Sequence, residues 1–422
     1  MLPTLTLSLV GALLPVVASA TSLLPFSLPA QSYALCQKKT KNPLAGCPPH
    51  TIYVSQTSHP DAKFSTIQSA IASLPNNTTP HVILIAPGTY TEQLNVTRPG
   101  PLTLLGVSDR PWQSRTLAPA SSSTFDYDAP LPSNEVQIYW NSANVNNNLL
   151  LDNVFTGVLT IGPTLNATFT GAGPNGWPVD PSTPFGSSDF RAYNIDFRNE
   201  FAPRSVGPAH ALGVSRANAG FYSCGFYSYQ DTIYIGKLGN AYFYDTIVAG
   251  QTDFLYGFGT LYIAKSHLSM RNCGGGITAW KGTNTTTAAP NKYGVYISQT
   301  QFRAANSSVA SIIKDRCSLG RPWNDIHRSV IMESYFDDSI LPAGYTGWEG
   351  KPPNNNGVGA GTIMAVHKVF GPGYDDAAER ASNITKVFDW TQARPYLKPV
   401  DVFVTDKGLP DVKWLDPIAW LP

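Results

Sequence analysis

The sequence predicts an all-β protein, and within that class a parallel β-helix (a solenoid) with long loops and a short N-terminal helix. Of its 422 residues, 42% are hydrophobic and only 14% are charged, whereas soluble proteins average about 25% charged residues. Glycine and proline, 35 residues each, predict frequent turns. In addition, Phe221-Tyr222 recurs 22 residues later as Phe243-Tyr244. Repeats of about 20 to 30 residues built from short strands indicate a solenoid, and a β-sandwich is the alternative.

The near balance of positive and negative residues excludes some classes of binding partner. The chain has 29 Lys and Arg against 28 Asp and Glu, a net charge of +1. Nucleic acids and anionic membranes attract strongly basic surfaces, so neither is expected as a partner. The composition is also the opposite of a disordered one. The length is sufficient for a large core in one elongated domain or two compact ones.

The N-terminal residues predict secretion. Residues 1–20 are largely apolar and end in Ala18-Ser19-Ala20, which is typical of a cleaved signal peptide, although no Lys or Arg precedes the apolar stretch. The alternative, a membrane anchor, is disfavoured because the stretch is short and broken by Pro15. Glycosylation of a secreted chain would use the acceptors at Asn76, Asn77, Asn95, Asn166, Asn284, Asn306 and Asn383.

The remaining elements follow in order. Residues 21–50 are expected to form an N-terminal arm, and residues 51–422 a single β-helix domain. Apolar residues at 64, 67, 70, 71 and 74 have helical spacing and predict a helix that ends before Pro75. Residues 81–86 and 102–105 read as buried strands. Between 109 and 188 the pattern weakens into long loops with short strands at 136–139 and 157–161, and we expect this enlarged region to form a wall or lid at one end of a cleft.

The five cysteines leave the disulfide pattern open. Cys36 and Cys47 are close in sequence and could staple the arm, whereas Cys224 and Cys273 lie in strand-like runs and could be buried apolar residues. The odd count, completed by Cys317, leaves at least one thiol unpaired. No Cys or His cluster in the sequence suggests a metal site.

Two aspartates lie one period apart. Because one turn of a β-helix advances the chain by one strand spacing, about 4.8 Å, Asp231 and Asp253 are expected to be neighbours on adjacent coils. Two carboxyl groups that close have pKa values that split, so one can act as an acid while the other is a charged nucleophile or base. The alternative is that each caps a turn.

Three motifs in order resemble a known family. The runs Tyr229-Gln-Asp-Thr-Ile-Tyr234, Thr252-Asp-Phe-Leu-Tyr-Gly257 and Leu319-Gly-Arg-Pro-Trp323 are similar to the signature motifs of pectin methylesterases, carbohydrate esterase family 8. Lesser matches occur at 88–92, 221–226 and 342–348, so the resemblance extends from about residue 51 to about 350. It implies a right-handed parallel β-helix.

The resemblance also implies roles. Asp253 would be the nucleophile, Asp231 the general acid and then base, and Gln230 an amide donor to the oxyanion. Arg321 would hold Asp253 ionised, although such a pair can be purely structural. The side chains expected to contact the substrate are Tyr229, Trp323 and Trp348, and for the two tryptophans the alternative is a place in the core.

Departures from the family pattern bear on the substrate. Pro208 stands where the family has a glutamine that supplies a second oxyanion donor. His210, two residues on and on the same strand face, is hypothesised to replace that donor or to contact substrate, and the alternative is a surface histidine. Trp280 and Lys281 stand where the family often has a Gln-Gly-like pair. The two alternatives are that they alter the groove and that they lie outside it. The enlarged region adds Trp112, Trp140 and Trp177.

Taken with the resemblance, the sequence predicts a secreted, monomeric aspartyl esterase that demethylesterifies pectin and releases methanol through an acyl-enzyme. It is expected to need no metal and no cofactor. One alternative is a related hydrolase acting on a different uronate or acyl ester. The other is a carbohydrate-binding β-helix with little catalysis, which the joint presence of Asp231, Asp253 and Arg321 disfavours.

Overall fold

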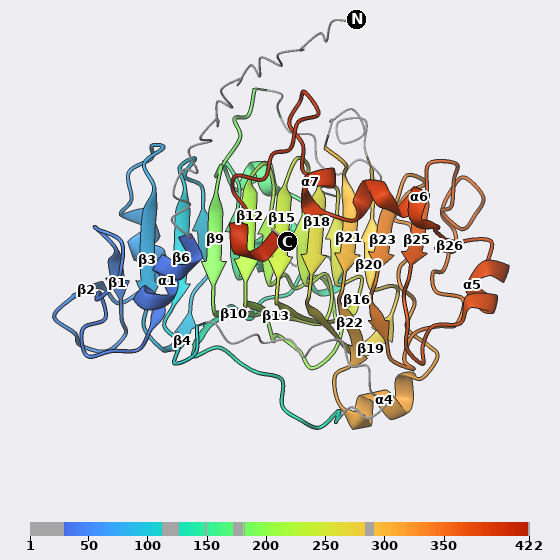
Figure 1. Ribbon diagram of the computed structural model, residues 1–422, viewed down its shortest axis with the longest axis horizontal. Coiled ribbons are helices and arrows are strands. Elements are labelled where there is room, and N and C mark those ends of the chain that lie inside the picture. The colour runs from blue at the N-terminus through green and yellow to red at the C-terminus, as the bar shows by residue number, and fades with distance from the viewer. Residues whose placement is uncertain are drawn as a thin grey trace, which may run out of the picture.

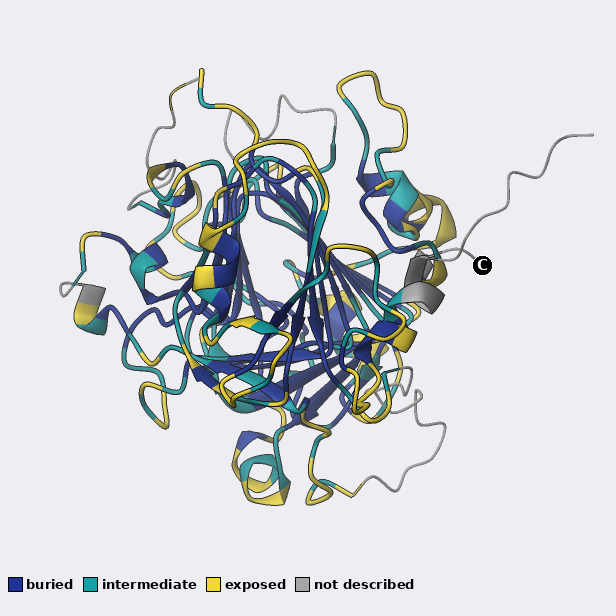
Figure 2. Ribbon diagram, turned by 90° about the vertical axis from the view of Figure 1, so that its left-hand side faces the viewer, coloured by how far each residue is buried: buried dark blue, intermediate teal, exposed yellow. Residues whose placement is uncertain are grey.

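The computed structural model describes residues 29–111, 126–147, 150–171, 180, 182–282 and 291–420. The predicted signal peptide, the acceptor Asn284, and Trp112 and Trp177 of the enlarged region lie outside these residues. The described chain winds into a right-handed parallel β-helix whose strands line up along the long axis (Figure 1). Viewed along that axis, the strands surround a core of buried residues (Figure 2).

Three parallel sheets form the walls of the β-helix. The largest has 12 strands, in the order β2 (Ala62–Phe64), β1 (Ile52–Val54), β3 (His81–Ile85), β6 (Leu102–Gly106), β9 (Phe190–Tyr193), β12 (Asn218–Tyr222), β15 (Asn240–Tyr244), β18 (Thr260–Ala264), β21 (Gly294–Ser298), β23 (Arg328–Met332), β25 (Ile363–His367) and β26 (Lys386–Val387). The second has eight strands, β24 (Tyr335–Phe336), β22 (Gln301–Ala304), β19 (His267–Gly274), β16 (Ile247–Thr252), β13 (Gly225–Tyr227), β10 (Ile195–Arg198), β7 (Val136–Tyr139) and β4 (Gly88–Thr91). The third has six, β20 (Thr278–Trp280), β17 (Leu255–Gly257), β14 (Ile233–Ile235), β11 (Leu212–Val214), β8 (Leu159–Ile161) and β5 (Leu94–Val96).

Helices are short and lie outside this frame. The α-helices are α1 (Pro29–Gln37), α2 (Ile67–Ala72), α4 (Ser307–Ile313), α5 (Asp376–Ala381), α6 (Trp390–Ala393), α7 (Pro399–Val402) and α8 (Pro417–Trp420). The 3-10 turns are η1 (Val145–Asn147), η2 (Asn153–Thr156), η3 (Asn166–Thr168) and η4 (Arg394–Tyr396). The helix predicted over 64–74 is shorter, because Phe64 ends β2 and the side chain of Thr66 caps the helix by accepting a hydrogen bond from the Ser69 N–H.

The repeat predicted from the sequence corresponds to the pairing of strands between neighbouring coils. Phe221 pairs with Phe243 between β12 and β15, and Tyr234 pairs with Tyr256 between β14 and β17. Inside the coil, Phe226 stacks on Phe243 with 4.8 Å between ring centroids. Neighbouring strands are parallel and one period apart, so the β-sandwich alternative is wrong.

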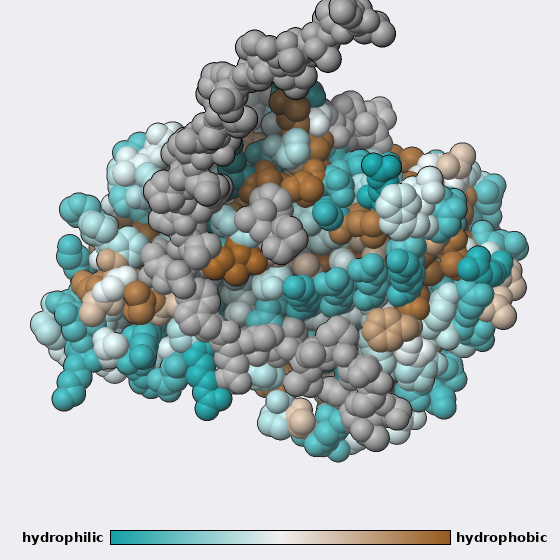
Figure 3. All heavy atoms as spheres, in the orientation of Figure 1, coloured by the Kyte–Doolittle hydropathy of each residue, from teal (hydrophilic) through white to brown (hydrophobic). Residues whose placement is uncertain are grey.

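The C-terminal segment covers the outer face of the 12-stranded sheet, which the sequence did not reveal. A ladder of tyrosines on that face packs against Val402, Phe403, Trp414 and Leu415. The ladder anchors the segment through hydroxyl groups: Tyr193 donates to Asp416 Oδ2 at 2.8 Å, and Tyr242 donates to the Ala419 carbonyl at 2.8 Å. Figure 1 shows α6, α7 and the C-terminus crossing in front of these strands. The same face carries small apolar patches among hydrophilic residues (Figure 3).

The structure pairs four of the five cysteines. Cys36 bonds Cys47 within the arm, as the spacing suggested. Cys273 bonds Cys317, so the interpretation of Cys273 as a buried apolar residue is wrong, whereas Cys224 is buried and belongs to no disulfide. The second bridge joins the end of β19 to the segment that leads to Arg321. Among the described residues, no helix has the length and apolar character needed to cross a bilayer.

Glu379 on α5 predicts a pH-dependent stability. Its side chain is fully buried, and its carboxylate oxygens have no hydrogen-bond partner among the described residues. Burial, reinforced by Asp376 and Asp375, raises the pKa of Glu379 from 4.5 to about 8. Between these values the folded state binds the proton more tightly than the unfolded chain, so stability falls as pH rises, by at most about 1.4 kcal/mol per pH unit.

We expect the melting temperature to fall between pH 5 and pH 8 in the wild type and to fall less in Glu379→Gln, which cannot ionise. Glu349→Gln, at an exposed position, is the control and should keep the wild-type slope. Identical pH profiles for wild type and Glu379→Gln in thermal melts would contradict this assignment.

Candidate active site

The two aspartates lie side by side, at the corner between the eight-stranded and six-stranded sheets. Asp231 comes just before β14 and Asp253 just before β17, in the next coil. The Asp231 N–H donates to the Thr252 carbonyl, which ties the two coils together at this corner. Both residues have left-handed backbone conformations, with φ of 57° and 46°. The same conformation recurs at other corners of the coil, for example at Ser223 and Asp245, so it belongs to the corner geometry of the β-helix.

Arg321 grips Asp253 with both ends of its guanidinium group. Its Nε donates to Asp253 Oδ1 at 2.9 Å and its Nη2 to Oδ2 at 2.6 Å. The Gly276 N–H adds a third hydrogen bond to Oδ1 at 3.1 Å. The Trp348 ring lies 3.7 Å below the guanidinium carbon and supports its plane. Three donors and a bidentate geometry favour the charged, fixed carboxylate that a nucleophile needs.

Asp231 has the opposite environment. Burial, and then the negative charge of Asp253, raise the pKa of Asp231 well above its usual value, and Arg321 offsets this only in part. The carboxyl is therefore stabilised in its protonated form. Asp231 therefore has the protonated form that an acid requires, beside an Asp253 carboxylate held by Arg321, and the two carboxyl groups are neighbours on adjacent coils, as the repeat predicted.

Gly275 makes room for the Arg321–Asp253 pair. Its φ is +67°, and a Cβ built there would lie 2.6 Å from Asp253 Oδ1 and 2.7 Å from the Arg321 guanidinium carbon. We expect Gly275→Ala to displace the ion pair and to reduce turnover about 10²-fold, because a displacement of about 1 Å of a reacting group has costs of this size.

The matched control is Gly408→Ala, where φ is +72° and a Cβ would have no neighbour within 4 Å. It imposes a similar backbone strain away from the cleft, so its turnover should stay near that of the wild type. If both variants lose activity equally, backbone strain and not the ion pair explains the loss.

The pair opens into a cleft of about 420 Å³. Of the residues predicted from the sequence, Asp231, Asp253, Gln230, Arg321, Trp323 and Trp348 all line it. The other lining residues are Asn144, Leu150, Leu151, Asp152, Asn153, Thr170, Gly171, Pro208, Tyr256 and Ala279. Those from 144–171 come from the enlarged region, which is the wall expected from the sequence. Asp152 holds this wall together by accepting hydrogen bonds from the backbone of Val154, Thr170 and Gly171.

Two predicted substrate contacts lie outside the cleft. Tyr229 is not among the lining residues, and its ring packs under the Arg271 guanidinium carbon at 4.6 Å. His210 is fully buried and also does not line the cleft, so neither direct contact with substrate nor a surface position is correct. Its Nε2 lies 2.5 Å from the hydroxyl of Tyr256, a residue that does line the cleft.

The Trp280-Lys281 pair lies below the groove. Trp280 is a core residue whose Nε1 donates to the Gly259 carbonyl. Lys281 is also fully buried, with Nζ 3.2 Å from the centroid of the Trp323 ring. Burial lowers the pKa of Lys281 to about 6. One face of Trp323 is thus covered by Lys281. Trp140, from the enlarged region, packs against the core.

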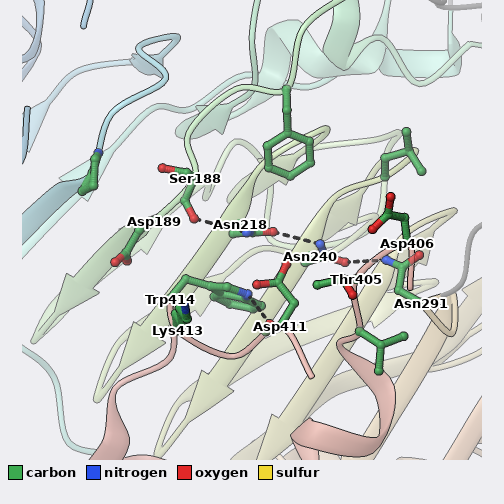
Figure 4. Close-up of a pocket in the computed structure, with 14 residues that line it drawn as sticks. Ser188, Asp189, Asn218, Asn240, Asn291, Thr405, Asp406, Asp411, Lys413 and Trp414 are labelled. Atoms are coloured by element: carbon green, nitrogen blue, oxygen red, sulfur yellow. Dashed lines mark hydrogen bonds between the residues drawn. The ribbon is translucent and has the colours of Figure 1, made fainter. Parts of the chain in front are cut away.

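A second cavity of about 730 Å³ lies between the 12-stranded sheet and the C-terminal segment (Figure 4). Asn218, Asn240 and Asn291 form a chain of amide hydrogen bonds along its floor. Trp414 Nε1 donates to the Asp411 carbonyl at its edge. These polar groups satisfy one another, and the cavity lacks the closely paired carboxyl groups of the first cleft. Among the described residues, no group of three or more His, Cys, Asp or Glu side chains is placed to hold a metal ion.

Three functional features escaped the sequence analysis. Tyr256 occupies the cleft, Gly275 gives the ion pair its space, and Asp152 organises the wall. For Gly275 the sequence did contain a signal, the Gly274-Gly275-Gly276 run, because consecutive glycines indicate a close approach of backbone to other groups. The other two depend on contacts between distant coils.

Comparisons with known proteins identify relatives of this chain. A family model described as Pectinesterase matches residues 180–377. The chain is 28% identical over 362 residues to a probable pectinesterase A of Aspergillus niger, covering 84% of this chain and 89% of that one. It is 30% identical over 239 residues to a probable pectinesterase/pectinesterase inhibitor 41 of Arabidopsis thaliana, covering 51% of this chain but only 39% of that protein.

The fold has solved counterparts. A pectin methylesterase crystallised in complex with a hexasaccharide superposes with a TM-score of 0.60 at 23% identity, covering 84% of this chain and 97% of that one. At this identity the likeness establishes the β-helix fold. The family model covers the coils that carry Asp231, Asp253 and Arg321.

Proposed function

The chain belongs to the pectinesterase family, and from this premise we propose that it is a carboxylic-ester hydrolase that removes methyl groups from pectin. The observation that carries the proposal is the geometry at the sheet corner: Asp253, gripped by Arg321, lies beside a protonated Asp231 in an open cleft. Binding a polysaccharide does not require such a pair, whereas ester hydrolysis does.

In the first step, a carboxylate oxygen of Asp253 attacks the ester carbonyl of a galacturonosyl residue. Among the described residues, Asp253 Oδ2 accepts one hydrogen bond, from Arg321, whereas Oδ1 accepts two, from Arg321 and the Gly276 N–H, so Oδ2 keeps a lone pair for the attack. Collapse of the tetrahedral intermediate breaks the bond to methoxide. Asp231 donates its proton to that oxygen, and methanol leaves.

In the second step, the mixed anhydride between Asp253 and the uronate is hydrolysed. Asp231, now a carboxylate, takes a proton from water while the water oxygen attacks the uronate carbonyl. The bond to Asp253 breaks, the product leaves as galacturonic acid and then loses its proton to solvent, and both aspartates return to their starting states. Gln230, which lines the cleft, donates its amide to the oxyanion in both steps. The two reaction steps use only protein side chains and water.

The substrate is held between aromatic walls. Trp323 and Trp348 line the cleft, where Lys281 packs on the Trp323 ring and both Arg321 and Lys351 pack on the Trp348 ring. The ring surface that borders the cleft is the proposed contact for a sugar ring. The net charge of +1 leaves binding of a polyuronate to these local groups.

We propose that the chain acts as a secreted monomer. The apolar N-terminal stretch and the glycosylation acceptors support secretion.

A comparison of substrates tests the proposal. Methanol release would be measured from highly methylated pectin, and acetate release from an acetylated polysaccharide without methyl esters. Methanol release alone is the expected result. Acetate release alone would move the assignment to another acyl ester, and binding of pectin without either product would replace the esterase by a carbohydrate-binding protein.

A further inference from the structure

The proposed oxyanion site lacks a donor on one side. Pro208 lines the cleft next to Gln230, since the Ala209 N–H donates to the Gln230 carbonyl in the neighbouring coil. The proline ring has no N–H and no polar side chain to offer an oxyanion. A single side-chain donor would leave the developing negative charge poorly stabilised, because the loss of one donor typically slows such reactions about 10²- to 10³-fold.

The Tyr256 hydroxyl lies toward the side of the oxyanion site on which Pro208 offers no donor. The Tyr256 backbone belongs to β17, in the coil of Asp253, but its ring leans back over Tyr234, with 5.0 Å between centroids. The hydroxyl ends 2.5 Å from Nε2 of His210, which lies one coil before Asp231. It therefore lies beside the coil that carries Pro208. Tyr256 and Pro208 line the same cleft. The negative charge of Asp231 contributes to the raised pKa of the Tyr256 phenol.

The hydrogen-bond partners of the phenol decide where its proton points. His210 is neutral, because burial lowers its pKa to about 3. A neutral imidazole has one N–H, and the His210 Nδ1 has no hydrogen-bond partner in the described part of the chain. Placing the hydrogen on Nδ1 would leave a buried donor unpaired, which is rarer than an unpaired acceptor. The Nε2–H therefore donates to the Tyr256 oxygen.

Asn153 completes the arrangement. Its side chain makes a second hydrogen bond that favours negative charge on the Tyr256 oxygen, and its own carbonyl oxygen accepts from the Asn144 amide at 2.8 Å. With both lone pairs of the phenol oxygen engaged by His210 and Asn153, the hydroxyl hydrogen is left free on the cleft side. Burial keeps the phenol protonated, since it raises the pKa of Tyr256 well above its usual value.

We propose that Tyr256 is the second oxyanion donor of the proposed esterase, and that His210 and Asn153 are positioning residues that direct its hydroxyl into the cleft. The inference rests on the proposed function. It assigns to Tyr256 the stabilisation that Pro208 does not provide, and to the buried His210 a role through Tyr256.

The test is Tyr256→Phe, which removes only the hydroxyl group. We expect kcat for methanol release to fall about 10²- to 10³-fold with KM changed less than about threefold, since the donor acts on the oxyanion and not on the bound ester. Tyr234→Phe, one coil earlier in the same ladder, is the matched control and should retain kcat within about twofold. Adding Pro208→Gln to Tyr256→Phe should restore part of kcat by returning a donor to the same side. Equal kcat for wild type and Tyr256→Phe overturns the proposal.

A second measurement follows His210 without turnover. Nitrogen-15 shifts of the imidazole, assigned by comparison with His210→Gln, should show an Nε2–H tautomer that does not titrate between pH 5 and 8. His210→Gln should retain more activity than His210→Ala because the amide can still donate to Tyr256. An Nδ1–H tautomer overturns the positioning role. A wild-type protein that releases no methanol overturns the proposed esterase and this inference together, whereas an active wild type with an unaffected Tyr256→Phe overturns this inference alone.

Discussion

Asp253→Asn is expected to abolish methanol release, with a loss in kcat of roughly 10⁴-fold or more, as for removal of other nucleophiles that act within a unit. The amide is the same size as the carboxylate but is a poor nucleophile, and it loses the charge that pairs with both ends of Arg321. The variant should still bind pectin, because the tryptophans of the cleft are unchanged. Methanol release under saturating pectin, together with pectin binding, measures both expectations.

Asp245→Asn provides the control. Asp245 has the same left-handed conformation, with φ of 55°, but it lies at another corner of the coil and accepts from the Ser223 hydroxyl. It should keep nearly all of the wild-type turnover. Equal methanol release from wild type and Asp253→Asn would remove the nucleophile assignment and leave the carbohydrate-binding alternative in its place.

Asp231→Asn is expected to lower kcat about 10²- to 10⁴-fold, because it removes the proton donor to methanol and the base for water. The wild type should also show a characteristic pH dependence. The raised pKa of Asp231 keeps the acid form present at pH values where an ordinary aspartate has ionised. Acyl-enzyme formation should therefore decline only as pH rises through this raised value, well above 3.8, and the decline should be absent from the residual activity of Asp231→Asn.

Single-turnover measurements separate the two roles of Asp231. With substrates whose leaving alcohol is more acidic than methanol, formation of the acyl-enzyme needs less help from an acid, so Asp231→Asn should lose less in that step than in hydrolysis. A variant that keeps the wild-type kcat and its basic limb would show that another group moves the proton.

The coil periodicity explains why so much of the fold was predictable. The recurrence of Phe221-Tyr222 at Phe243-Tyr244 is the pairing of β12 with β15, and identical residues recur because each coil buries the same position in the same way. The helix predicted over 64–74 was longer than α2, since the cap at Thr66 is a local hydrogen bond that apolar spacing does not report.

The placement of individual side chains was less predictable. His210 was expected at the cleft or at the surface, and it lies beneath Tyr256. Tyr229 belongs to a signature motif, yet it faces Arg271. Strand alternation gives the face on which a residue lies, but it does not give how far a ring leans across neighbouring coils.

The sequence by itself determined the solenoid, the pairing of Asp231 with Asp253, and the family, because each of these is encoded within one period or within a short motif. The tertiary structure alone decided how these side chains meet residues from other coils and loops. Arg321, which the family resemblance assigned to Asp253, reaches it across 68 residues, Gly275 leaves space for that ion pair, and the hydroxyl of Tyr256 comes to lie beside Pro208. The repeat aligns one coil with the next, but it does not specify how loops and side chains from distant parts of the chain meet at that corner.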